Sequence, residues 1–165
     1  MSQYNQGPRG FQRGEGRPGP GWPQHSSDFP APTAREIEAI IRGGDARVLV
    51  ESASKVGKAL AERRLSTGQI RGVFGAVRRI EMRWPDGAPQ EVDDREIKEL
   101  LLLKPRLAYQ VGKAKAGNSG QSKSIADLEP ILRQAIDLVS DRANFRHFVD
   151  YLEAILAYHK FGDGR

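Results

Sequence analysis

The chemistry that this sequence concentrates is cationic. Residues 100–126 contain five basic side chains and no acidic one, and Tyr109 lies among them. Arg71 and Arg78 are seven residues apart, so on a helix they would project within about 20° of each other. Guanidinium and ammonium groups gathered in this way suit the phosphates of a polyanion, and arginine can bind a phosphate through two hydrogen bonds.

The distribution of charge supports the same interpretation. The chain of 165 residues carries 26 Lys and Arg against 21 Asp and Glu, a net charge of +5. Residues 42–115 hold 16 basic and 10 acidic groups, so this segment alone carries +6. Within it, Lys55 and Lys58 would share one helix face. A local excess of this size can steer polyanions; the plain alternative is that these cations only make helix exteriors soluble.

Residues that could carry out catalysis are scarce. The absence of cysteine excludes disulfides, thiolate zinc sites and a cysteine nucleophile. His147 and His159 are 12 residues apart, too far along a helix to share a metal, and we expect His159 to be a packed, hydrogen-bonded core residue. No cluster of carboxylates suggests a two-metal nuclease. We therefore predict a protein that is not an enzyme and has no catalytic residues, metal or cofactor.

The elements that position the cations begin after a Gly/Pro-rich segment. Residues 1–32 hold 6 of the 18 glycines and 6 of the 10 prolines but no Leu, Ile or Val, which predicts a disordered tail. Its Arg-Gly pairs weakly resemble RNA-binding segments, although a plain solvated linker is the favoured interpretation. No apolar run of about 18 residues or secretory signal occurs, so we expect a cytoplasmic protein with no membrane partner.

From residue 33 onward the apolar residues recur with helical spacing. Capping boxes at Thr33 and Ser66 predict helix starts, and Gly43-Gly44 predicts a helix end. We expect residues 33–165 to form an all-α domain, a single compact bundle of five to six helices around one core.

Several local features leave alternatives. Residues 79–84 alternate apolar and charged side chains, as in a hairpin strand, but we favour the end of a helix followed by a loop. Pro105 should break or kink a helix, which would turn Lys104 outward toward a ligand or leave it snorkelling along an apolar face.

Three expectations concern the last two helices. Ser124 and Asp127 should open the first of them, and the final helix should begin at Asp141 and stop before Gly162. Residues 145–158 of the final helix should pack into the core or contact another subunit. Tyr151 and Tyr158 are seven residues apart and could face a neighbouring protein.

Four segments in order then make the sequence recognisable: residues 66–71, 77–81, 102–109 and 148–160. Over roughly residues 35–161 the chain resembles the small subunit of the type III-A CRISPR effector, the Csm complex. The N-terminal tail and the length of the loop at residues 84–90 lie outside the family pattern.

This resemblance implies an all-helical, non-catalytic, prokaryotic protein that contacts a guide RNA–target RNA duplex, mainly through the backbone of the target strand. It implies other effector subunits and further copies of the same chain as partners; isolated protein could be a monomer or a homodimer. The alternatives are a free-standing helical RNA- or DNA-binding protein outside CRISPR and, less favoured, a metal-dependent nuclease. The predicted RNA-binding residues are Lys55, Lys58, Arg71, Arg78, Arg79, Lys104, Arg106, Tyr109 and Lys113.

Overall fold

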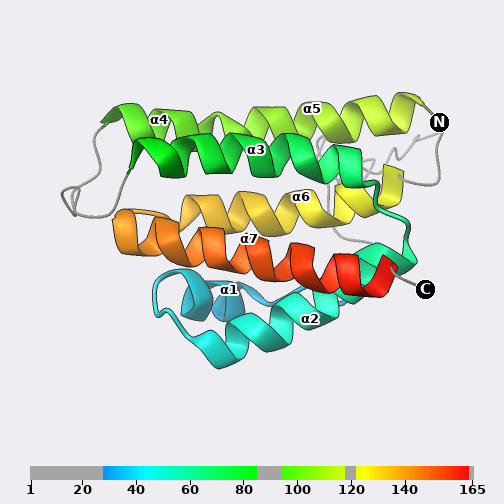
Figure 1. The fold of residues 1–165 in the computed structure, drawn as a ribbon, viewed down its shortest axis with the longest axis horizontal. Helices are drawn as coiled ribbons and strands as arrows, with labels where there is room; N and C mark the ends of the chain where they lie inside the picture. The colour runs from blue at the N-terminus through cyan, green and yellow to red at the C-terminus, as the bar shows by residue number, and fades with distance from the viewer. Residues whose placement is uncertain (1–27, 85–93, 118–121, 164–165) are drawn as a thin grey trace, which may run out of the picture.

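The computed structural model describes residues 28–84, 94–117 and 122–163, and every regular element within these ranges is an α-helix (Figure 1). The helices are α1 (Ala34–Ile41), α2 (Ala46–Glu62), α3 (Thr67–Arg83), α4 (Asp94–Leu101), α5 (Leu103–Ala116), α6 (Ser122–Asp137) and α7 (Arg142–Asp163). Only Leu102 separates α4 from α5, so with these two counted as one broken element the described residues contain six helices. The predicted all-α bundle is confirmed.

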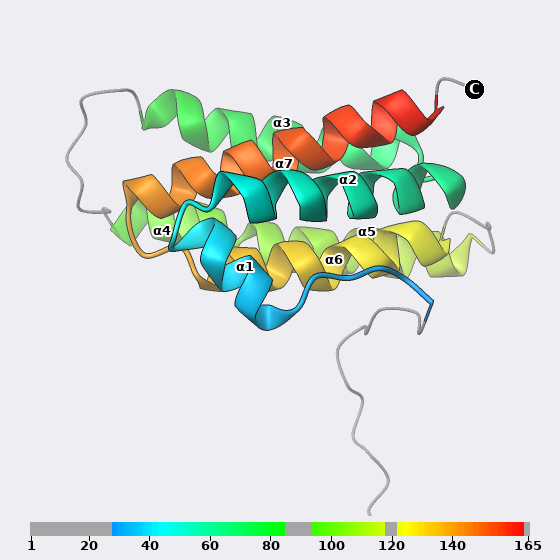
Figure 2. The same ribbon diagram turned by 90° about the horizontal axis from the view of Figure 1, so that it is seen from below.

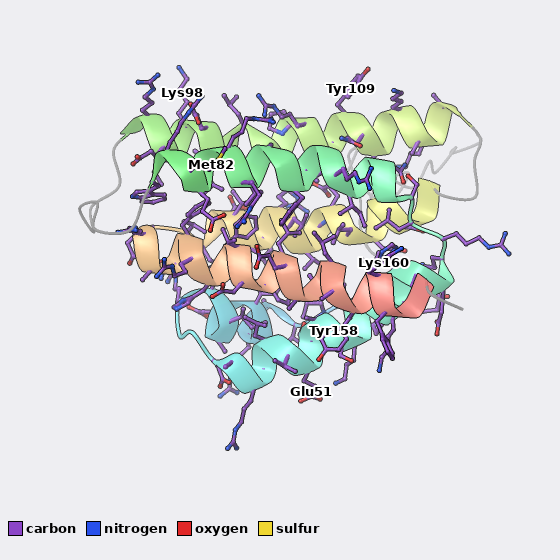
Figure 3. The ribbon with its side chains drawn as sticks, in the orientation of Figure 1. Glu51, Met82, Lys98, Tyr109, Tyr158 and Lys160 are labelled. Atoms are coloured by element: carbon purple, nitrogen blue, oxygen red, sulfur yellow. The ribbon has the colours of Figure 1, made fainter. Side chains whose placement is uncertain are left out.

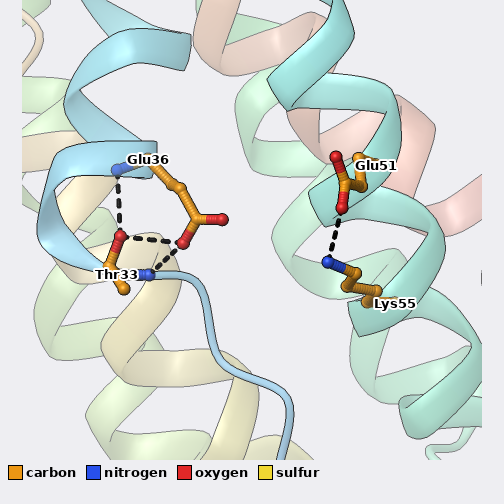
Figure 4. Close-up of polar contacts among 4 residues, drawn as sticks. All are labelled: Thr33, Glu36, Glu51 and Lys55. Carbon is orange, nitrogen blue, oxygen red and sulfur yellow. Dashed lines mark hydrogen bonds and ion pairs between the residues drawn. The ribbon is translucent and has the colours of Figure 1, made fainter.

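Local sequence signals fix the starts of the first three helices. Thr33 caps α1 with the full capping box, because its hydroxyl accepts from the Glu36 amide while the Glu36 carboxylate accepts from the Thr33 amide at 2.7 Å (Figure 4). Asp45 caps α2, and Ser66 caps α3. Between α1 and α2, Gly44 adopts φ of 63°, a left-handed conformation that glycine allows without a steric penalty.

The strand-like alternation at residues 79–84 lies on a helix. α3 runs unbroken to Arg83, so the favoured helix is confirmed over the described part of this segment and the hairpin strand is wrong. Ile80 and Trp84 are buried, and the Trp84 ring stacks on Phe145 of α7 with 5.0 Å between centroids. The charged partners in the alternation lie on the helix exterior. Residues 85–93, which include most of the predicted loop, lie outside the described ranges.

The predicted break near Pro105 falls three residues earlier, at Leu102. A proline inside a continuous helix would remove the hydrogen bond to the carbonyl four residues before it and clash with that group. For Pro105 this carbonyl belongs to Leu101, the last residue of α4. Pro105 instead occupies the first turn of α5, where its missing amide costs nothing.

The two final helices form the centre of the bundle. α6 and α7 run across the middle, with α3, α4 and α5 on one side and α1 and α2 on the other (Figures 1 and 2). α2 lies along α7, and α5 lies along α6. Every helix contributes buried apolar side chains to one continuous core, including Ile37, Leu60, Leu107, Ile131 and Phe148.

α7 differs from expectation at two points. It begins after Asp141, whose carboxylate accepts from the Asn144 amide at 2.8 Å, as predicted, but it continues to Asp163 rather than stopping before Gly162. Tyr151 does not face a neighbour. It is fully buried, its hydroxyl lies 2.7 Å from the Ser52 hydroxyl on α2, and burial raises the pKa of Tyr151 to about 12. Helical spacing alone could not show that α2 covers this flank.

Arg63, at the end of α2, joins three segments of the chain. Its guanidinium pairs with the buried carboxylate of Asp127 on α6, pairs with Asp28 at 2.8 Å and lies over the Phe29 ring. Its carbonyl accepts from the Ser124 hydroxyl at 2.6 Å. The prediction that Ser124 and Asp127 open a helix is wrong, because α6 begins at Ser122 and both side chains serve this corner.

The corner also bears on the predicted tail. Residues 1–27, for which the sequence predicts disorder, lie outside the described ranges. Residues 28–32, the end of the predicted tail, contact the bundle, and Phe29 is buried in the core. A single aromatic residue carries no periodicity, and for that reason the sequence did not reveal its place.

Candidate nucleic-acid interface

A groove runs between α3 and α5. Its central hollow has a volume of about 330 Å3. α3 contributes Gly72, Val73 and Ala76, which recur on one face of the helix and are small enough to leave space between the two helices. The α5 side of the hollow is lined by Leu103, Pro105, Arg106, Tyr109 and Gln110.

Adjoining hollows extend this groove in both directions along the helices. One shares Ala76 and Arg106 with the central hollow and reaches Arg79, Arg83 and Glu99. The other shares Tyr109 and Gln110 and is also lined by Ser66, Gly68, Gln69, Lys113, Ala114 and Gly117. Because neighbouring hollows share lining residues, we treat the three as one surface and name it the α3–α5 groove.

The charge of the α3–α5 groove is strongly positive. Arg79, Arg83, Arg106 and Lys113 line it, and Glu99 is its one acidic residue among those that the structure describes. The Glu99 carboxylate pairs with Arg83. Arg79, Arg106 and Lys113 are exposed and form no ion pair within the described ranges. Three cations without a protein counter-charge therefore follow one groove.

Tyr109 projects from α5 at the rim of the α3–α5 groove. Its side chain is 70% exposed and points away from the bundle at the edge formed by α4 and α5 (Figure 3). An aromatic side chain this exposed keeps its apolar surface in contact with water, which is unfavourable, and it contributes little to the core. It is available to stack on an aromatic ligand.

The predicted site residues do not all reach this groove. The structure brings four of the nine together there: Arg79, Arg106, Tyr109 and Lys113. Arg71 is exposed on α3, outside the groove lining and without an ion pair in the described part of the chain.

Three of the nine predicted residues already form ion pairs: Arg78, Lys104 and, on α2, Lys55. Arg78 pairs with Glu81 at 2.6 Å and with Glu153 of α7 at 3.2 Å, so it turns toward α7. Lys104 pairs with Asp137 of α6 and is mostly covered. The break before α5 thus directs Lys104 toward α6 instead of toward the α3–α5 groove.

Lys55 and Lys58 lie on α2, across the bundle from α3 and α5. Lys55 pairs with Glu51 at 2.7 Å, and the hydrogen bond and charge of that carboxylate raise the pKa of Lys55 (Figure 4). Glu51 and Tyr109 occupy opposite edges of the molecule (Figure 3). Lys55 and Lys58 therefore lie on a different face of the bundle from Arg106 and Lys113 of α5.

Sequence reasoning overlooked three members of the groove: Gly72, Arg83 and Gln110. Arg83 follows Arg79 by four residues, the spacing of one helix face, but the strand-like alternation concealed that relation. Gly72 and Gln110 bear no charge, and nothing in a single helix shows that they would face one another.

Both helical histidines are used structurally. His159 is buried and its Nε2 lies 3.0 Å from the Leu65 carbonyl, which confirms the predicted core role, while His147 Nδ1 lies 2.9 Å from the Ile41 carbonyl. Over the ranges that the structure describes, there is no group of three or more His, Asp or Glu that could hold a metal. The helices in those ranges are also too short or too polar to span a membrane.

Comparison with known proteins identifies the chain. No curated protein and no solved structure gave a significant match. The family model Csm2 Type III-A matches residues 44–165, which contain helices α2 to α7 and the whole α3–α5 groove. The chain belongs to this family and is a small subunit of the type III-A CRISPR effector, the Csm complex.

Proposed function

We propose that the α3–α5 groove binds the sugar-phosphate backbone of the guide RNA–target RNA duplex, mainly on the target strand. The observation that carries this proposal is the row of exposed cations without counter-charges, formed by Arg79, Arg106 and Lys113. Cations that bind phosphates hold a protein in register but carry no sequence information. Base pairing with the guide would supply the specificity, as in RNA-guided recognition generally.

The pairing of some basic residues with carboxylates supports a single RNA-binding face at the α3–α5 groove. Arg78 and Lys104 are neutralised by carboxylates of α3, α6 and α7, so an RNA phosphate would have to displace those partners. Arg79, Arg106 and Lys113 need no such exchange. Arg71 is exposed on α3 but lies outside the lining of the groove, so it is not part of this row.

The remaining parts of the proposal concern partners and activity. As a member of a multi-subunit effector, the chain would contact other subunits and further copies of itself through faces other than the α3–α5 groove. It would act in the prokaryotic cytoplasm as a structural, non-catalytic subunit, with RNA cleavage carried out elsewhere in the complex.

Two double variants with the same change of charge test the site. Arg79→Glu with Arg106→Glu should lower RNA affinity at least about 100-fold, because two charge-assisted interactions become repulsive. On single-stranded RNA the log–log salt dependence should weaken by about 0.7 for each phosphate that the protein no longer neutralises. Lys55→Glu with Lys58→Glu on α2 is the matched control and should change affinity less than about threefold. Equal decreases in affinity for both variants would contradict the assignment to the α3–α5 groove.

Two further observations separate the alternatives. A tagged chain should purify from its host with guide RNA and larger subunits; purification alone with unrelated RNA or DNA would favour an independent binding role. Incubation of the pure protein with labelled RNA and Mg2+ or Mn2+ should leave the RNA intact. RNA cleavage that follows the protein through purification would contradict a non-catalytic role.

A further inference from the structure

From the shape of the α3–α5 groove we infer that its central hollow holds one unpaired nucleobase of the bound RNA. The inference rests on the proposed function, because it assumes that the groove binds RNA, and it adds an interaction that phosphate binding alone does not require. An apolar floor, an exposed aromatic rim and flanking cations are the features that point to a base.

The floor of the hollow is apolar. Gly72, Val73 and Ala76 form its α3 side, and Leu103 and Pro105 lie on its α5 side. At about 330 Å3 the hollow is at the small end of the range of roughly 300–1,000 Å3 that holds compact ligands. A planar heterocycle fits such a space. A phosphate could pair with Arg106, which also lines the hollow, but it would lose hydration against the apolar floor.

Gly72 keeps this floor open. A methyl group at this position would lie 3.0 Å from the Gln110 side-chain nitrogen, tighter than an ordinary contact. Glycine in the middle of a helix costs about 1 kcal/mol relative to alanine, and no apolar neighbour at Gly72 demands it for packing. The same absence of a side chain leaves the Gln110 amide at the edge of the hollow, where it can donate to or accept from a base edge.

Tyr109 supplies the stacking surface. Tyr109 lines the hollow, yet 70% of the residue is exposed, so its side chain is available to a ligand. Stacking of a base on an aromatic side chain tolerates any base identity, because each base has a π face. A site of this kind suits a subunit that must accept any target sequence.

The rim explains why we favour a nucleobase over an apolar side chain of a neighbouring protein. Arg106 lines the central hollow itself. Arg79 lines the hollow that adjoins it in one direction and Lys113 the hollow that adjoins it in the other. A nucleotide inserted at the centre would carry its two flanking phosphates toward these cations. An apolar side chain would leave the same cations without counter-charges.

The test compares two RNA duplexes that differ by one base. One contains a single-nucleotide bulge and the other contains an abasic residue at the bulge, so the phosphates are identical. With the full chain we expect the base-containing bulge to bind about 5- to 150-fold more tightly, the range for stacking one base. A 2-aminopurine at the bulge should lose fluorescence on binding. Equal affinity for the two RNAs would overturn the inference.

Three variants assign the effect to the hollow. Tyr109→Ala and Gly72→Leu should each bring the ratio of the two affinities to about one, the first by removing the stacking ring and the second by filling the floor. Tyr109→Phe should preserve the ratio. Circular dichroism and thermal melting establish that each variant is folded. A ratio that persists in both Tyr109→Ala and Gly72→Leu would place base recognition elsewhere and overturn the inference.

A charge variant separates this inference from the proposed function. Arg79→Glu with Lys113→Glu should weaken binding of both RNAs while their ratio stays above one. If neither duplex binds the original chain, the proposed function itself fails. If the hollow variants change only the recovery of other effector subunits and leave the ratio intact, the hollow receives a protein side chain, and the base assignment is wrong.

Discussion

The α2–α7 seam and the α3–α5 groove both lie between neighbouring helices, but their chemistry is opposite. Along the seam the helices touch closely: a methyl group on Gly57 would lie 2.6 Å from the Ile155 carbonyl oxygen. The buried polar pair there, Ser52 and Tyr151, is satisfied internally. In the groove, Gly72 borders an open hollow, and Arg79, Arg106 and Lys113 have no ion-pair partner within the described ranges. The seam is completed by the chain itself, whereas in the groove these cations have no counter-charge from the described residues.

The largest expected effect that separates the two regions is the response of the seam to alkaline pH. The pKa of Tyr151 is about 12 in the folded protein and about 10 in an unfolded chain. The folded state therefore holds this proton more tightly. Stability from this source is complete below pH 10 and is lost as the pH rises through 12, by roughly 3 kcal/mol in total. Denaturant unfolding at several pH values measures this decline.

The control for this prediction is Tyr151→Phe. It should lower stability at neutral pH by about 1–3 kcal/mol, because Ser52 remains buried without its partner. The variant should then show a shallower decline between pH 10 and 12 than the original chain. Identical pH profiles for the two proteins would mean that lysine and other tyrosine groups account for the alkaline decline.

The next effect concerns glycine at the seam. Gly57→Ala places a methyl group against backbone atoms of α7, which cannot move independently of the helix. We expect stability to fall by about 2 kcal/mol, because overpacking of 1–3 kcal/mol outweighs the gain in helix propensity. Urea unfolding provides the measurement. Increased stability in Gly57→Ala would show that the seam has room for a methyl group, and the contrast with the α3–α5 groove would fail.

The smallest effect is a gain on the groove side. Gly112 is exposed in the middle of α5, and a methyl group there would meet nothing within 4 Å. Gly112→Ala should raise stability by up to about 1 kcal/mol through helix propensity alone. Measured under the same conditions as Gly57→Ala, it gives the opposite sign for the same substitution. Lower stability in Gly112→Ala would reveal packing on this surface.

Helix positions could be predicted from sequence because their signals are local. The Thr33–Glu36 capping box and the helix end at Gly43-Gly44 each depend on a few neighbouring residues, and both occur as expected. The hairpin alternative at residues 79–84 arose because a charged helix exterior can imitate strand alternation over six residues. The burial of Tyr151 depends on its contact with α2, about 100 residues away, and no local sequence pattern reveals that contact.

The candidate site was predictable only in part for the same reason. Residue type correctly indicated cations, but Arg78 and Arg79 are adjacent in sequence and differ completely in surroundings: one is paired with two carboxylates and the other has none in the described ranges. Which cation is neutralised depends on how α3 lies against α7. Gly72 and Gln110 became members of the site only because α3 and α5 lie side by side.

The pairing of Ser52 with Tyr151 across 99 residues has a consequence for biosynthesis. α1 and α2 leave the ribosome early, but much of the apolar surface that they bury is supplied by α7, the last of the described helices. Contacts so distant in sequence form only after a long loop has closed, which slows folding. The amino-terminal helices must therefore wait, with apolar faces uncovered, until nearly all of the domain has been translated, and during that interval nascent chains are most exposed to aggregation.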